Sequence, residues 1–402
     1  MEGLLWEIFG LVLNVKLLQS IVMKSELLRQ NSKQVVNELL EKIKANAELT
    51  LGYPTSKNYE FDELLPFLKY PLNNVGDPFI PSTYTVGTRE LEKEVVEFFA
   101  KLFRAEEDNW WGYVTNGGSE GNLYGLYLAR ELYPKAIVYY SEATHYSVQK
   151  NLHLLNMPNI AIRSYDNGEI DYEDLEKTIS INRQMPVIIL ANIGTTMTEA
   201  RDDVGKMKAI FKHLAIQHHY IHADGALSGS YAAFVEPRPA FDFADGADSI
   251  AISGHKFLGS PIPCGLVIAK KSHRDRIARS IDYIGSLDTT ISGSRNGHTP
   301  LFLWYIINKL GIKGLRERTQ TCLEVAEYAL TELKKIEPTA WRNPSTLTIS
   351  MPKPDKVIVK KWQLASENAW AHIICMPGIT KIMIDEFVKD LELSKTNVLS
   401  LV

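Results

Sequence analysis

The sequence predicts an α/β fold, in which a large domain holds a mostly parallel, seven-stranded sheet and a smaller α+β domain follows at the C-terminus. Two observations predict it. Between about residues 110 and 270, short apolar runs alternate with amphipathic helical stretches, and such alternation requires right-handed crossovers between parallel strands. After Leu301 the pattern changes to long helices and two short strand-like runs, which is typical of a separate, smaller unit.

Length and composition are those of a soluble globular protein. The 402 residues can bury a large core, and 45% of them are hydrophobic and 23% charged. A net charge of −4 offers no basic surface to nucleic acid. The three cysteines, Cys264, Cys322 and Cys375, are widely spaced and odd in number. This argues against a disulfide framework and for a reducing compartment, so we expect a cytoplasmic protein.

Residues 1–25 form an apolar N-terminal extension. The stretch Gly3–Met23 is long enough to span a bilayer but carries Glu7 and Lys16, and a central charge is costly in lipid. It also lacks the basic region and cleavage site of a signal peptide. We expect no firm membrane contact and favour an amphipathic interface helix over an anchor. A native start at Met23 is the third alternative.

The following segment, 26–85, combines a helix with an extended stretch. Leucine, isoleucine and valine recur at helical spacing over Lys24–Leu51, whereas Gly52–Thr88 is rich in proline, asparagine, glycine and tyrosine. The large domain is then expected over 86–300 and the small domain over 301–402.

Strands and helices alternate through the large domain, after a first helix near Glu90–Phe103. The expected strands are Gly112–Thr115, Ala136–Tyr140, Ile160–Ser164, Pro186–Asn192, Tyr220–Ala223, Ser249–Ser253 and Gly265–Ala269. Helices are expected between them near Glu120–Leu132, Tyr146–Leu155, Tyr172–Ile181 and Val204–His218, and the small domain has strand-like runs at Thr346–Met351 and Ala371–Met376. Open α/β sheets bind ligands at the carboxyl ends of their strands, so the residues after each strand are the candidates for chemistry.

A glycine-rich stretch, Thr115–Asn122, follows the first strand and opens a helix. Its amide groups and the helix dipole would face an anion, and its glycines would let the backbone approach a phosphate. Ser119 or Asn116 could add a side-chain bond. The stretch matches neither a Walker loop nor a dinucleotide fingerprint, so a plain tight turn is the alternative.

Two more strand ends carry residues suited to a flat, nitrogen-containing ring. His145 follows the second strand and could stack on such a ring or cap the next helix. Asp224 follows the fifth strand, and an aspartate that faces a pyridine nitrogen keeps it protonated; a helix cap or a turn is the alternative role. The small side chain of Ala226 leaves room for the ring.

Lys256 follows the sixth strand, within Ser253–Phe257 and before a Gly/Pro turn. A crowded lysine loses its proton readily and forms a Schiff base with an aldehyde. Taken alone, this residue would more simply be a surface lysine. An anion loop, a stacking histidine, an acidic partner and a lysine, in this order on successive strand ends, together favour a site for pyridoxal phosphate.

Four histidines lie close together in the sequence and could suggest a metal site. They are His213, His218, His219 and His222. Because they straddle a helix end, a loop and a strand, their side chains should diverge, and we expect no metal site.

Six motifs carry a resemblance to a known family. They are WGYVTNGGSEGN (Trp111–Asn122), THYSV (Thr144–Val148), ANIGTT (Ala191–Thr196), HADGALSG (His222–Gly229), SGHKFLGSPIPCG (Ser253–Gly265) and GSRNGHTPLFLW (Gly293–Trp304). Together they resemble the group II pyridoxal-phosphate-dependent amino-acid decarboxylases, and within these the bacterial histidine decarboxylases and their plant serine decarboxylase relatives. The resemblance covers about residues 50–310. It implies the type I fold of aspartate aminotransferase and active sites at a homodimer interface.

The resemblance also implies roles for single residues. Lys256 would bind the cofactor covalently, His145 would stack on its ring and Asp224 would pair with its pyridinium nitrogen. Ala226 would pack on the other ring face, and Thr196 would lie near the ring or the substrate carboxylate. The remaining cofactor contacts would come from Gly117, Gly118, Ser119, Ser253 and His255.

The run Ile284–Arg295 would supply a mobile loop or a phosphate contact, including Ser294, to the neighbouring subunit. Its glycine, serine and threonine content independently suggests flexibility. Tyr283 fits the family pattern best as the proton donor to Cα, with His255 and Lys256 as alternatives.

The expected reaction is the α-decarboxylation of an L-amino acid, with the cofactor ring as electron sink. The Trp111–Asn122 and Ser253–Gly265 matches favour L-histidine, which would give histamine. L-Serine, giving ethanolamine, is the alternative, because Asn74–Ile80 and Lys361–Ala365 look more like the plant serine enzymes. An aminotransferase, a carbon–carbon lyase and a non-enzymatic binding module are the other classes considered.

Overall fold

The computed structural model describes residues 31–57, 60–81, 83–276, 279–281 and 286–399. The chain divides into two units, Met1–Thr50 and Leu51–Val402. The first is helical over residues 31–48, inside the predicted helix, and the apolar extension lies outside the described residues. No helix in the described ranges is both long and apolar enough to cross a membrane. The predicted domain boundaries stay predictions.

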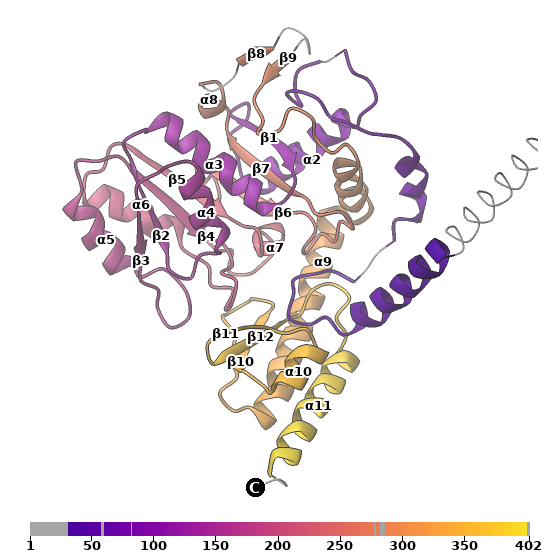
Figure 1. Cartoon of the computed structure of the whole chain (residues 1–402). Coiled ribbons are helices and arrows are strands. Elements are labelled where there is room, and N and C mark those ends of the chain that lie inside the picture. Colours follow the sequence, from indigo (N-terminus) through magenta and orange to yellow (C-terminus); the bar gives the residue numbers. More distant parts are fainter. Residues whose placement is uncertain (1–30, 58–59, 82, 277–278, 282–285, 400–402) are drawn as a thin grey trace, which may run out of the picture. The chain divides into compact units, whose positions relative to one another are not determined.

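A seven-stranded sheet forms the centre of the second unit (Figure 1). Its strands are β1 (Trp110–Thr115), β2 (Ile137–Ser141), β3 (Asn159–Ile162), β4 (Val187–Asn192), β5 (His219–Asp224), β6 (Ser249–Ser253) and β7 (Gly265–Lys270). The strand order is β1-β7-β6-β5-β4-β2-β3. The ladder from β6 to β3 is parallel, whereas β7 runs antiparallel to both of its neighbours. The predicted fold class is therefore confirmed.

Helices fill the crossovers between the parallel strands. They are α3 (Gly118–Leu132), α4 (Ser147–Leu154), α5 (Tyr172–Ile181), α6 (Val204–His213) and the single turn α7 (Gly229–Ala232), whereas α2 (Arg89–Leu102) precedes β1 and the single turn α8 (Lys271–Arg274) follows β7. The predicted end of α6 at His218 is wrong. Ala215 has a φ of +54°, and a residue in this left-handed conformation ends a helix.

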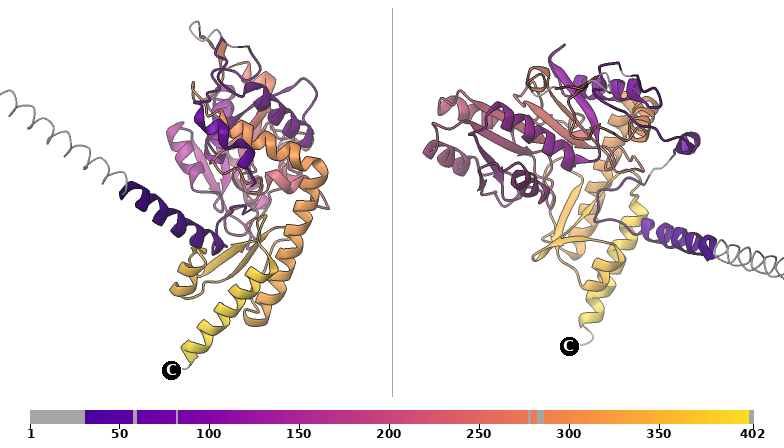
Figure 2. Two further views of the ribbon diagram at one scale, coloured as in Figure 1. Left: turned by 90° about the vertical axis from the view of Figure 1, so that its right-hand side faces the viewer. Right: turned by 45° about the horizontal axis from the view of Figure 1, so that its top comes forward.

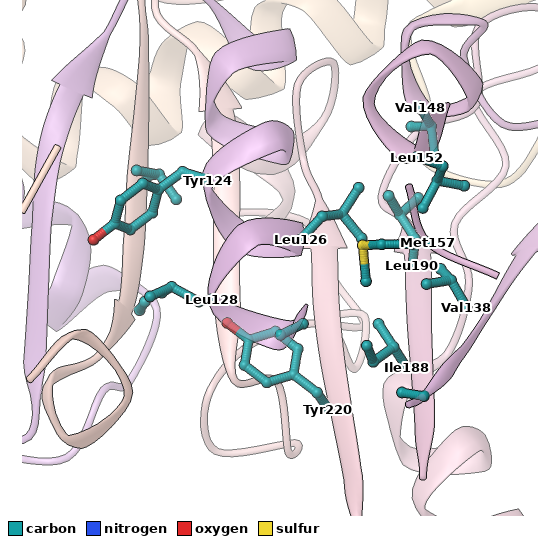
Figure 3. Close-up of a cluster of buried hydrophobic side chains, with 14 of the residues drawn as sticks. Tyr124, Leu126, Leu128, Val138, Val148, Leu152, Met157, Ile188, Leu190 and Tyr220 are labelled. Carbon is teal, nitrogen blue, oxygen red and sulfur yellow. The ribbon is translucent and has the colours of Figure 1, made fainter. Parts of the chain in front are cut away.

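Alternate residues of β4 pack into two different cores. Ile188 and Leu190 lie with side chains of α3 and α4, as Figure 3 shows. Val187 and Ile189 lie with side chains of α5 and α6. Successive strand side chains point to opposite faces, so a strand that is covered on both sides has a continuous apolar sequence. Because β2 to β6 run parallel to one another, their carboxyl ends lie at one edge of the sheet.

The segment predicted as extended, Gly52–Thr88, contains a helix. The 3-10 helix η1 (Asp62–Lys69) buries Leu64 beside Phe61 and Phe302. The prediction is wrong for these eight residues. Two turns of 3-10 helix are too short to give the helical periodicity on which the prediction depended.

The C-terminal part follows a long helix, α9 (His298–Ile336), which is interrupted at Gly311 with a φ of +59°. The other elements are β10 (Thr348–Pro352), α10 (Lys356–Lys361), β11 (Ala365–Glu367), β12 (Trp370–Ile374) and α11 (Lys381–Leu399). The three strands form an antiparallel sheet of order β10-β12-β11. Helix α9 packs against α2 at one end and against β10 and α11 at the other (Figure 2). The sequence did not predict β11, which has only three residues.

A second small sheet overlaps the segment predicted as a mobile loop, Ile284–Arg295. Its strands are β8 (Arg279–Ile281), which precedes that segment, and β9 (Ser286–Asp288), which lies within it; the two pair antiparallel. Tyr283 lies between them and outside the described residues.

Candidate active site

The predicted site residues gather at the carboxyl ends of β1, β2, β5 and β6. A Cβ atom built on Gly118 would stand 2.8 Å from the Ala226 Cβ and 2.9 Å from the Ser253 Oγ. The charges of Asp224 and Lys256 both act on the His145 ring. Residues from four separate strand ends are thus brought within reach of one small ligand.

The glycine-rich loop leaves room for an anion at the start of α3. Gly117 has a φ of +150°, and no atom lies within 4 Å of the place where its Cβ would be. No side chain caps the first turn of α3, so its amide groups and the positive end of the helix dipole are available to a phosphate. A methyl group at Gly117 would occupy this space. The loop therefore fits the phosphate end of the predicted cofactor.

Asn116 and Ser119 were the predicted side-chain ligands of the anion. Asn116 donates from both its backbone amide and Nδ2 to Glu120 Oε2, at 2.9 and 2.7 Å, so it stabilises the loop itself. The side chain of Ser119 is exposed, and its carbonyl accepts from Asn151 Nδ2 at 2.9 Å. Of the two, only the Ser119 hydroxyl stays open to an incoming anion.

His145 is held in one tautomer beside the sheet edge. Its Nδ1 lies 2.8 Å from Ser147 Oγ and accepts from the Ser147 amide at 3.3 Å, which leaves the hydrogen on Nε2. Burial lowers the pKa of His145, with Asp224 opposing and Lys256 adding to this effect. A neutral, oriented imidazole is suited to stack on a flat ring.

The residue before this histidine is fixed from the neighbouring strand. Asn192 Nδ2 donates to Thr144 Oγ1 and to the buried Asp202, each at 3.0 Å. Asn192 also pairs with Asp224 in the register of β4 and β5. The strand that adjoins Asp224 thus helps to position the histidine.

Asp224 is nearly buried, at 6% exposure, and both of its oxygens accept hydrogen bonds. Oδ1 accepts from the Ala226 amide at 3.0 Å, and Oδ2 accepts from Asn122 Nδ2 at 2.7 Å. These bonds fix the plane of the carboxylate. Each oxygen keeps a further lone pair for a donor such as a protonated ring nitrogen.

Lys256 lies in a setting that favours the free amine. Burial lowers the pKa of its ammonium group, while the carboxylates of Asp224 and Glu199 act in the opposite direction. A lysine with a lowered pKa is a better nucleophile toward an aldehyde. This is the chemistry for which the sequence singled the residue out.

The neighbouring His255 is oriented by the chain after Lys256. Its Nδ1 lies 2.7 Å from the Cys264 carbonyl oxygen and 3.1 Å from the Cys264 amide nitrogen, so the Cys264 backbone fixes the plane of the ring. Burial lowers the pKa of His255. Ser253, two residues earlier, is buried at 2% exposure beside the glycine loop.

Thr196 is exposed on the loop after β4, and the C-terminal part of the chain holds that loop in place. Glu199 is fully buried and accepts from the Leu347 amide at 2.9 Å and from Thr348 Oγ1 at 2.6 Å. Ser228 Oγ donates to its other oxygen at 2.8 Å. The C-terminal sheet thus takes part in shaping the site, which the sequence did not reveal.

The predicted contact at Ser294 lies on the surface. Its hydroxyl is 3.2 Å from Asn73 Nδ2, which joins the two loops that contain these residues. In the described part of the chain, no hydrogen bond joins Ser294 to another of the predicted site residues, and its role toward a neighbouring subunit stays a prediction.

The four clustered histidines have different partners. His213 bonds to Glu176, His219 lies 2.8 Å from Lys208 Nζ, and His222 Nε2 lies 2.9 Å from Asn122 Oδ1. No group of ligands in the described ranges could hold a metal ion. His222 instead reaches Asp224 through Asn122. The sequence held one signal for Asn122: it lies on the same helical face as Gly118, Gly121 and Gly125.

Comparisons with known proteins agree with this geometry. Residues 126–341 match the model of the pyridoxal-dependent decarboxylase conserved domain. The chain is 48% identical to a histidine decarboxylase of Mesorhizobium japonicum over 363 residues, which cover 90% of this chain and 98% of that protein. A histidine decarboxylase of Vibrio campbellii is 43% identical, over 89% of this chain and 94% of that protein. The structure also resembles L-methionine decarboxylase from Streptomyces sp. 590, with a TM-score of 0.83, 25% identity, and coverage of 90% and 95%.

Proposed function

The chain belongs to the pyridoxal-dependent decarboxylases, and from this premise we propose that it converts L-histidine to histamine and carbon dioxide. One observation carries the choice of substrate. The likeness to bacterial histidine decarboxylases reaches 43–48% identity over about nine-tenths of the chain.

Pyridoxal phosphate supplies an aldehyde for covalent attachment and a ring that accepts the electrons released as the carboxylate leaves. The chain would hold it through the Lys256 amine, the Asp224 carboxylate and the start of α3, where Gly117 leaves open space. The oriented His145 would bind one face of the ring, and the small Ala226 would allow its approach to the other.

The chain's own groups would then manage protons and solvent. Burial lowers the pKa of Lys256 and so favours its unprotonated amine, which is the form that could take up a proton when a substrate amine takes its place. Tyr283 is the proposed donor to the substrate Cα, and His255 and Lys256 are the alternatives. Thr196, on a loop fixed by Glu199, would meet the substrate carboxylate. The proposed remaining cofactor contacts are Gly118, Ser119, Ser253 and, from the partner subunit, its copy of Ser294.

The structural role of Asn74–Ile80 removes one argument for serine. This stretch favoured the serine alternative because it looks more like the plant serine enzymes, and the resemblance implied that it lines the substrate side of the pocket. However, Asn74 donates to the buried Glu92, and the buried Asp77 accepts from Trp111 Nε1 at 3.0 Å. The polar side chains of Asn74 and Asp77 therefore form hydrogen bonds with α2 and β1. In the second serine-like stretch, Lys361–Ala365, Trp362 Nε1 donates to Asp390 on α11.

We also propose that the protein is a homodimer in the cytoplasm. The helix over residues 31–48 exposes an apolar stripe in which Val35, Val36, Leu39, Leu40 and Ile43 are 47–62% exposed. Such a contiguous apolar face is suited to burial against a partner, and a second copy of this chain is the partner that shared active sites require. A monomer mass for the holoenzyme in light scattering would contradict this assembly.

A competition assay tests the proposed substrate. Purified holoenzyme is given L-histidine and L-serine together, and histamine, ethanolamine and carbon dioxide are quantified, with Lys256→Ala as the inactive control. We expect histamine as the main product, because a pocket built for imidazole leaves polar groups unpaired around a hydroxymethyl group. A kcat/KM that favours serine by about tenfold or more would overturn the proposal. Stoichiometric carbon dioxide without any need for an oxo-acid acceptor separates decarboxylation from transamination.

A further inference from the structure

A continuous chain of buried side chains leads to the Asp224 carboxylate. Asn122 Nδ2 donates to Asp224 Oδ2 at 2.7 Å, and His222 Nε2 lies 2.9 Å from Asn122 Oδ1. Ser249 Oγ lies 2.7 Å from His222 Nδ1. None of the four residues is more than 6% exposed, so water does not compete for these bonds and each is stronger than it would be at the surface.

Only one placement of the hydrogens lets every hydrogen bond in this series of side chains form when the carboxylate at its end is ionised. An ionised Asp224 can only accept, so Asn122 must turn its Nδ2 toward it and its Oδ1 toward His222. His222 must then carry its hydrogen on Nε2. Its Nδ1 accepts from the Ser249 hydroxyl. Every donor in the chain therefore points toward Asp224.

The fold produces this chain from three elements. His222 and Asp224 lie two residues apart on β5 and share one face of the sheet, while Ser249 pairs with His222 across the β5–β6 ladder. Helix α3 covers this face at close range. A Cβ on Gly125 would lie 2.2 Å from His222 Nδ1, so only glycine lets the helix bring Asn122 into contact with both partners.

We infer that Asn122 and His222 are positioning residues, which hold the Asp224 carboxylate in the orientation that keeps the ring nitrogen of the cofactor protonated. The inference rests on the proposed function, because it assigns this role to Asp224. Neither residue is placed to touch the ring. They act through the bond to Oδ2, which, together with the Ala226 amide on Oδ1, prevents rotation of the carboxylate.

The neutral state of His222 keeps the hydrogens of this hydrogen-bonded series in their single arrangement. Burial lowers the pKa of His222 to about 3, so the ring does not gain a second hydrogen near neutral pH. A protonated ring would have to donate to Ser249 as well. The direction of the donors thus stays the same across the pH range in which the enzyme would work.

The test uses holoenzyme reconstituted with pyridoxal phosphate labelled with ¹⁵N in the ring. Asn122→Leu removes the bond to Asp224 at similar volume, and His222→Leu removes the donor to Asn122. His222→Gln is the conservative variant, because its amide can place a donor where Nε2 stands. Tyr124→Phe is the matched control: it lies on the same helix and is buried, and it loses a 2.7 Å hydrogen bond to the Thr289 carbonyl away from Asp224.

We expect Asn122→Leu to shift the ¹⁵N signal toward the unprotonated ring and to lower kcat by about tenfold or more. KM for the amino acid should change much less, since no substrate contact is lost. His222→Leu should act in the same direction, His222→Gln should restore most of the signal, and Tyr124→Phe should leave it unchanged. If Asn122→Leu does not fold, His222→Leu and Ser249→Ala decide the matter, with a large shift of the ¹⁵N signal expected from the former and a small one from the latter.

The inference is overturned if Asn122→Leu and His222→Leu lower the melting temperature as Tyr124→Phe does but leave the ring nitrogen protonated and kcat unchanged. The ¹⁵N signal is recorded without an amino acid. An enzyme that prefers serine would therefore refute the proposed substrate and leave this result intact.

Discussion

Replacement of Glu92 should show most clearly which effects come from a loss of folding stability and which come from the chemistry of the site. Its carboxylate is fully buried and accepts hydrogen bonds from the Val114 amide at 2.9 Å, from Asn74 Nδ2 at 2.8 Å and from the buried guanidinium of Arg295. All three partners are donors. A carboxylate can accept hydrogen bonds from all three donors. In Glu92→Gln, the amide NH₂ group of the new side chain would face one of these donors and could not accept its hydrogen bond.

The neighbours cannot adjust to this change. The Asn74 amide is unable to turn over, because its Oδ1 already accepts from the Thr88 amide at 2.7 Å. Arg295 would stay charged and buried without an anion beside it. Loss of one member of a buried ion pair costs about 3–5 kcal/mol, against a total stability of about 5–15 kcal/mol for a folded protein. The Val114 amide also adjoins the anion loop, so the affinity for pyridoxal phosphate should fall as well.

Urea denaturation of Glu92→Gln and wild-type holoenzyme measures this loss. The matched control is Glu90→Gln on the same helix, where the side chain of Glu90 is 80% exposed and its ion pair with Lys93 at 3.3 Å should contribute less than about 1 kcal/mol. The double variant Glu92→Gln/Arg295→Met should be no less stable than Glu92→Gln alone, because it also removes the stranded charge. A loss below about 1 kcal/mol for Glu92→Gln, or strict additivity in the double variant, would refute the reasoning.

Three further predictions concern the site. Lys256→Ala should abolish turnover and covalent attachment of pyridoxal phosphate, which borohydride reduction and peptide mapping detect; attachment at another lysine would contradict the assignment. Gly125→Ala places a methyl group 2.2 Å from His222 Nδ1 and should destabilise the fold by about 1–3 kcal/mol, while Gly293→Ala, with no neighbour within 4 Å, should not. Because burial lowers the pKa of His222 from 6.5 to about 3, the unfolded chain takes up a proton first as the pH falls, and stability should drop by about 2 kcal/mol between pH 7 and pH 5. His222→Gln should remove this part of the pH dependence of the melting temperature. If the slope of melting temperature against pH is the same in this variant and the wild type, the prediction is wrong.

The sheet could be predicted from the sequence because its strands are covered on both faces. A strand such as Val187–Asn192 is apolar at nearly every position, and this pattern stands out from the periodic helices on either side. Elements that lack such a pattern were missed. The 3-10 helix Asp62–Lys69 and the three-residue strand Ala365–Glu367 are too short for periodicity to identify them.

The residues of the candidate site also divide into those that the sequence predicts and those that it does not. Residues that follow strands could be found, because the topology brings the strand ends to one edge, and the structure places Gly118, Ala226 and Ser253 together there. The supporting contacts could not be found, because they join residues distant in the sequence. Asn122 lies 102 positions before Asp224, and Glu199 lies 149 positions before Thr348.

The groups proposed to hold the cofactor and Thr196, proposed to meet the substrate carboxylate, are supported by different parts of the fold. Asp224 accepts a buried hydrogen bond from Asn122 on α3, and Thr144, next to His145, accepts one from Asn192 on β4, so both are held from within the large sheet and its covering helix. By contrast, the Thr196 loop depends on contacts with the C-terminal sheet through Glu199. A shift of that sheet would move Thr196 relative to a cofactor whose own position stays constant. A change in the C-terminal sheet should therefore weaken the proposed binding of the substrate carboxylate before it disturbs the groups at the sheet edge that are proposed to hold the cofactor.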